Sequence, residues 1–71
     1  MEYYNEKIAF FENRIEELKG VKEILYAKLE AGEFTGAEFA DRIRAVNLQI
    51  AANTNELNKF IKLQQSFNEQ Y

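Results

Sequence analysis

The chain has 71 residues, of which 46% are hydrophobic, and a formal net charge of −3. This much apolar material is enough for one small folded domain over residues 1–71, because its burial can offset chain entropy. The chain has no cysteine and no histidine, which excludes disulfides and thiolate or imidazole metal sites. A core of this size rarely supplies more than about 3–5 kcal/mol, so we expect a partner subunit to add stability.

Apolar residues recur at alternating spacings of four and three in two long segments, one on each side of a short break. Such spacing places each series on one stripe of a helix. We predict helices at about residues 2–31 and 35–70 whose stripes face each other along a common seam. The seam positions are Tyr4, Ile8, Phe11, Ile15, Leu18, Lys22, Leu25, Leu29, Phe39, Ile43, Val46, Ile50, Asn53, Leu57, Phe60, Gln64, Phe67 and Tyr71.

The break carries the usual signals of a helix end and a helix start. Gly32 suits the left-handed position that closes a helix. Thr35 suits the N-cap of the second helix, and Glu38, three residues later, completes a capping box. Phe34 precedes the cap, at a position that often packs onto the first helical turn. A turn at residues 32–34 is short enough to make the helices antiparallel neighbours.

The sequence from residue 29 to 43, L-E-A-G-E-F-T-G-A-E-F-A-D-R-I, resembles the turn and second helix of short bacterial helical-hairpin modules such as the SHOCT domain. Those modules have a glycine, an apolar residue, Ser or Thr and then a Glu-Phe pair. The resemblance covers about a fifth of the chain and implies the same kind of turn. The remaining, amide-rich part departs from that pattern, so no function is transferred.

Asn53 and Glu56 also fit a capping box, which would start a third helix and give a three-helix bundle with a break near Asn53. The seam spacing passes through Asn53 without a change of phase, which favours one continuous helix. An amide on the seam can also select one register and one oligomeric state, at a cost in stability. We therefore predict an all-α fold, an antiparallel two-helix hairpin that dimerises into a four-helix bundle.

The antiparallel arrangement gathers aromatic residues at the open end of the hairpin. Tyr3, Phe10, Val21 and Ile24 form a second apolar stripe off the seam, which an isolated hairpin would leave in contact with water. We expect the second stripe to serve an interface, and the aromatic residues either to close the core where no loop covers it or to serve an interface as well. The candidate interface residues are Tyr3, Tyr4, Phe10, Phe11, Val21, Ile24, Asn53, Phe60, Phe67 and Tyr71.

Groups suited to catalysis are scarce. Without histidine there is no Glu-x-x-His di-iron motif, and the glycines do not form a phosphate-binding loop. Glu12 and Glu16 share a helix face with basic neighbours, as on a solvated surface. We therefore expect no enzyme activity, no cofactor and no metal. The basic residues are scattered among acidic ones, which disfavours nucleic acid as a partner.

Location and partners follow from the same features. No apolar run approaches the roughly 20 residues of a membrane span, and the N-terminus is acidic where a signal peptide is basic. We expect a cytoplasmic, homo-oligomeric protein-binding module: an adaptor, regulator or inhibitor, including a phage or mobile-element accessory protein that blocks a host defence protein. The alternatives are an oligomeric binder of a small anionic or nucleotide-like ligand, and a structural coiled-coil assembly protein.

Overall fold

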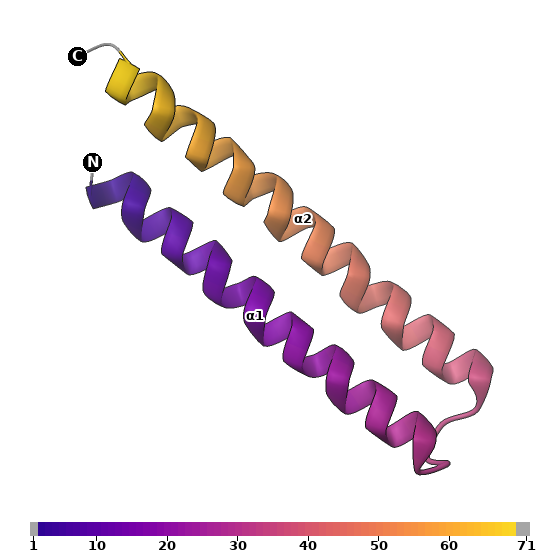
Figure 1. The fold of residues 1–71 in the computed structure, drawn as a ribbon. Helices are drawn as coiled ribbons and strands as arrows, with labels where there is room; N and C mark the ends of the chain where they lie inside the picture. The colour runs from indigo at the N-terminus through magenta and orange to yellow at the C-terminus, as the bar shows by residue number, and fades with distance from the viewer. Residues whose placement is uncertain (1, 70–71) are drawn as a thin grey trace.

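The computed structural model, which describes residues 2–69, contains two long helices, α1 (Glu2–Glu30) and α2 (Gly36–Glu69). They run antiparallel, so the start of α1 and the end of α2 lie at the same end of a rod (Figure 1). The rod measures 56 × 16 × 12 Å. The structure confirms the predicted all-α hairpin, and the helix bounds agree with the expected ones to within one residue over the described part of the chain.

Each helix buries the predicted seam against the other, because shielding apolar surface from water drives their pairing. All seam positions from Tyr4 to Gln64 are buried or partly buried. The buried side chains are Ile15, Leu18, Leu25 and Val46. Around Leu18, Leu25 and Val46 pack the partly buried side chains of Phe34, Phe39, Ile43 and Ile50. No side chain in the described region is completely shielded from solvent, since each helix has one neighbour within the chain.

The end of α1 is closed by the glycine that the sequence indicates. Gly32 has a φ of 79°, in the left-handed region that favours glycine. Its N–H donates to the carbonyl of Leu29, and the N–H of Glu33 donates to the carbonyl of Lys28, both at 3.0 Å. These two bonds form a Schellman motif, which satisfies carbonyls that the helix itself leaves open.

The start of α2 is fixed by the predicted capping box. The N–H of Glu38 donates to the Thr35 hydroxyl oxygen at 3.1 Å. In return, the N–H of Thr35 donates to Oε1 of Glu38 at 3.0 Å. Since both partners are satisfied reciprocally, α2 begins immediately after Thr35, and the turn is as short as the sequence predicts.

One helix passes through Asn53 without interruption, so the hairpin is confirmed over the three-helix alternative. The side-chain amide of Asn53 donates to the carbonyl of Gln49 at 2.7 Å. This bond lies within α2 and follows the i to i−4 pattern by which short polar side chains are accommodated inside helices. Asn53 is partly buried on the seam, and its amide has a partner in its own helix.

Thr35→Ala is expected to lower the free energy of unfolding by about 0.5–2 kcal/mol, because the N–H of Glu38 loses its acceptor. Denaturant titration of the parent and the variant measures the change. Thr35→Ser keeps the hydroxyl and should remain close to the parent. Equal stability of the alanine and serine variants would contradict the role of the cap.

The capping box also predicts a pH dependence. The backbone hydrogen bond with Thr35 lowers the pKa of the Glu38 carboxyl, assisted by a side-chain hydrogen bond with Thr35 and by the charge of Arg42. A lowered folded-state pKa stabilises the fold above the ordinary glutamate value of about 4.3, and this contribution is lost as the pH falls through the folded-state value.

Glu38→Gln keeps an acceptor oxygen but cannot ionise, so it isolates that contribution. We expect the parent to be more stable than this variant at about pH 6, and the difference in unfolding free energy to shrink by about pH 3. Other carboxylates titrate equally in both proteins. A difference that stays constant with pH would contradict the assigned pKa direction.

Asn53→Leu is expected to raise the melting temperature, because leucine is the better helix former and adds apolar surface to the seam. Asn55→Leu is the matched control, since Asn55 lies in the same helix but is exposed. It makes the same change in helix propensity without reaching the seam. A lower melting temperature for Asn53→Leu than for the parent would contradict its seam position.

Candidate protein-interaction surface

Aromatic rings from both helices meet at the open end of the hairpin. The ring of Phe60 stacks on Phe11 with centroids 5.9 Å apart, and lies 6.2 Å from Tyr3 and 6.5 Å from Tyr4. Tyr4 also contacts Phe67 at 6.5 Å. These separations are typical of favourable aromatic pairs. The cluster therefore joins α1 to α2 where no loop connects them.

The same cluster extends onto the surface. Phe10 meets Phe11 edge to face at 5.1 Å. Tyr3 and Phe10 nevertheless remain 59% and 54% exposed. One part of the cluster is thus partly buried on the seam, and another part is apolar surface available to a partner.

A polar contact crosses between the helices near these rings. The side-chain amide of Gln64 donates to Oδ1 of Asn5, which lies 59 residues away in the sequence. Gln64 is a seam residue, whereas Asn5 directly follows seam residue Tyr4 and was not among the predicted interface residues. Asn5 is a polar residue beside the seam, at the same axial position along the hairpin as the seam residue Gln64. This placement is the signal that could have identified the Asn5–Gln64 hydrogen bond.

Val21 and Ile24 lie further along α1, away from the aromatic cluster, and are 40% and 57% exposed. Like Tyr3 and Phe10, each directly precedes a seam residue. At 3.6 residues per turn, one residue is about 100° of rotation, so these four side chains lie on one side of α1. We call the residues of α1 that directly precede seam residues the flank of α1.

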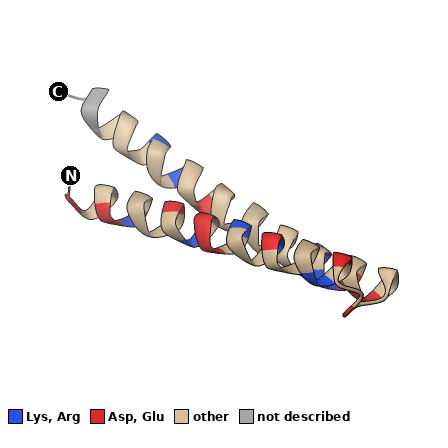
Figure 2. Cartoon of the chain, turned by 60° about the horizontal axis from the view of Figure 1, so that its bottom comes forward, with Lys and Arg blue, Asp and Glu red and all other residues tan. Residues whose placement is uncertain are grey.

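Charges of both signs are interspersed along α1 (Figure 2). The ion pairs join residues three apart on one helix and remain largely exposed, so each contributes little to stability. They are Arg14–Glu17 at 3.4 Å, Lys19–Glu16 at 3.7 Å and Arg44–Asp41 at 3.9 Å. The pattern gives no extended surface of one sign over residues 2–69, as a phosphate backbone would require.

Phe34 was expected to pack at the turn, but sequence reasoning missed its contacts with two cations. Its ring lies 4.6 Å from the guanidinium carbon of Arg42 and 5.9 Å from Nζ of Lys28. A cation over an aromatic face is attracted by the ring quadrupole. Because Lys28 and Arg42 come from different helices, these contacts tie both helices to the turn.

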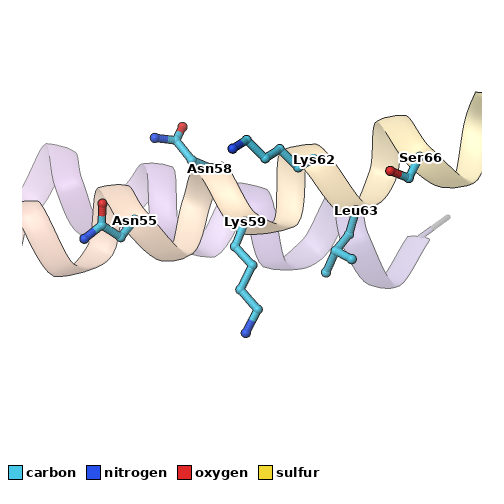
Figure 3. A pocket seen from close by; sticks show the side chains of 6 residues that line it. All are labelled: Asn55, Asn58, Lys59, Lys62, Leu63 and Ser66. Carbon is cyan, nitrogen blue, oxygen red and sulfur yellow. The ribbon is translucent and has the colours of Figure 1, made fainter.

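A shallow depression of about 410 Å³ lies on the surface of α2. It is lined by Asn55, Asn58, Lys59, Lys62, Leu63 and Ser66. Figure 3 shows that all six side chains come from α2 and that Lys59 and Lys62 point to different sides. With no second element to form a wall, the depression does not enclose a ligand.

Two further features bear on other functions. No three histidine, cysteine, aspartate or glutamate side chains within residues 2–67 lie close enough to share a metal ion. Neither α1 nor α2, as described, combines the length and the apolar character that crossing a membrane requires.

The structure thus brings six candidate residues together at the open end and places Val21, Ile24 and Asn53 elsewhere. Those six are Tyr3, Tyr4, Phe10, Phe11, Phe60 and Phe67. Val21 and Ile24 continue the exposed stripe along α1, Asn53 bonds within α2, and Tyr71 lies outside the described residues. Comparison of the chain with protein-family models, with curated proteins and with solved structures found no match.

Proposed function

We propose that this chain is a non-enzymatic protein-binding module, a small helical adaptor, regulator or inhibitor that binds through the flank of α1. The supporting observation is the exposure of Tyr3, Phe10, Val21 and Ile24, which ranges from 40% to 59%. Single exposed apolar residues are common on protein surfaces, but four large ones that share one side of a helix are typical of a helix-packing face.

The shape of the molecule favours binding over catalysis. All carboxylates between residues 2 and 67 are exposed to water, and so are the basic groups there except that of Lys22, which is partly buried on the seam. General acid–base catalysis needs such groups to converge on a substrate in a sheltered site. The flank, by contrast, offers a partner helix apolar contacts at four positions between residues 3 and 24 of α1.

Affinity capture with matched variants tests the proposal. Ile24→Ser removes apolar surface from the flank. Leu48→Ser makes the same change at a side chain that is 66% exposed but lies two residues from both Val46 and Ile50, on the side of α2 away from the seam.

The immobilised parent and Leu48→Ser should retain the same protein partner, and Ile24→Ser should lose it. Quantitative mass spectrometry of the retained proteins measures the difference, and circular dichroism verifies that both variants remain helical. Partners retained equally by all three proteins would contradict binding through the flank.

A further inference from the structure

The flank of α1 repeats the spacing of the seam over its whole length. Its eight positions alternate between steps of four and three residues, and all eight are exposed. They are Tyr3, Lys7, Phe10, Arg14, Glu17, Val21, Ile24 and Lys28. A second alternating set on one helix is a second face of the kind that packs against another helix. Within the chain, α2 packs on the seam of α1, and the flank remains exposed although the ring of Tyr3 reaches that of Phe60.

The opposite side of α1 has a different character. Its positions, which directly follow seam residues, are Asn5, Ala9, Glu12, Glu16, Lys19, Glu23, Tyr26 and Glu30. Five of the eight are charged, and Lys19 pairs with Glu16 there at 3.7 Å. Four of the eight flank positions are charged, and its other four are large apolar residues, whereas Tyr26 is the large apolar residue of this opposite side. Desolvating the opposite side would therefore cost more free energy for a smaller apolar gain. A helix that packs on α1 beside α2 is therefore best accommodated on the flank.

We propose that the occupant of this flank is the flank of a second copy, packed antiparallel about a two-fold axis. This inference rests on the proposed function and names the partner of that surface. The axis passes midway between Arg14 and Glu17, which makes the contact self-complementary. The alternating steps then pair Tyr3 with Lys28, Lys7 with Ile24, Phe10 with Val21 and Arg14 with Glu17, in both directions.

The side chains that meet in each of these pairs suit that register. Phe10 meets the aliphatic Val21 of the second copy, and the alkyl stems of Lys7 and Lys28 can cover Ile24 and Tyr3 while their ammonium groups remain in water. These contacts bury the four apolar residues of the flank that the hairpin alone leaves exposed. The two ends of the contact are equivalent because the axis relates them.

Charge selects the antiparallel orientation. Arg14 and Glu17 pair within one helix at 3.4 Å and remain exposed. Across the axis, each Arg14 would also meet Glu17 of the second copy. A parallel arrangement would instead place Arg14 against Arg14 and Glu17 against Glu17, which costs free energy through like-charge repulsion.

The second helix permits the same approach. In an antiparallel hairpin, residues that precede the seam lie on the same side of both helices, so α2 adjoins its copy when α1 does. The positions of this kind in α2 are all exposed, and they are Glu38, Arg42, Ala45, Gln49, Ala52, Glu56, Lys59, Leu63 and Ser66. The small side chains of Ala45 and Ala52 let the two copies of α2 approach, so that a four-helix bundle closes.

Charge variants in solution test both the occupant and the register. The parent should sediment at twice the chain mass at micromolar concentration. Arg14→Glu and Glu17→Arg should each weaken self-association by about tenfold or more, because each places like charges opposite each other. An equimolar mixture of the two variants should recover a dimer of mixed mass, detected by native mass spectrometry. Loss of the intrachain pair cannot produce this recovery, since each chain keeps its own like charges.

Cysteine pairs test the orientation, because the natural chain has no cysteine. A mixture of Phe10→Cys and Val21→Cys should form a disulfide-linked dimer on oxidation, and neither variant alone should do so. Leu48→Cys, outside the proposed contact, is the control. Cross-linking of Phe10→Cys to itself would overturn the antiparallel register.

A parent that remains monomeric at all concentrations would overturn the second copy as occupant. The capture experiment separates that result from failure of the proposed function: a monomer that retains another protein in an Ile24-dependent manner is still a protein-binding module. Failure of both experiments would remove the binding role of the flank altogether.

Discussion

In a hairpin of two helices, each helix has only one intramolecular neighbour, and the rest of the structure follows from this constraint. One stripe of each helix is shielded, so the buried core is reduced to Ile15, Leu18, Leu25 and Val46. A single layer of side chains contributes limited stability in a chain of this size. Any additional apolar row must remain in water or find a partner outside the chain, which is the situation of the flank of α1.

Two kinds of contact hold the seam in register, one at each end of the rod. At the turn, the Gly32 closure and the Thr35–Glu38 capping box determine where each helix ends and begins. At the open end, the aromatic cluster and the Asn5–Gln64 hydrogen bond align helices that no loop connects. The seam between them needs only the correct periodicity, because its ends are fixed separately.

The fold could be predicted because its signals are local or periodic. The spacing through Asn53 indicated one continuous α2, and the residues around Gly32 and Thr35 placed the turn without knowledge of any distant contact. Such information is contained in a few neighbouring residues. The dimer expected from the same sequence stays a prediction, because it depends on a second molecule.

The contacts that sequence reasoning missed depend on the axial offset between the helices. Asn5 reaches Gln64 only at the particular axial offset that the two helices adopt in the hairpin. Phe34 lies near Lys28 and Arg42 only because the turn points its ring between both helices. Tyr3 contacts Phe60 and yet stays largely exposed. This too could be predicted only by knowing how far α2 extends beside Tyr3. Periodicity identifies a face but not this offset.

The short turn has a kinetic consequence. Contacts beside it close a small loop, whereas the contact of Asn5 with Gln64 joins residues 59 apart in sequence. The entropy cost of loop closure rises with loop length. Contacts between α1 and α2 should therefore form first at the turn and then successively towards the termini. Local opening should run in the reverse direction, so backbone amides near the open end should exchange with solvent before those near the turn. The aromatic cluster therefore occupies the part of the molecule that opens most readily.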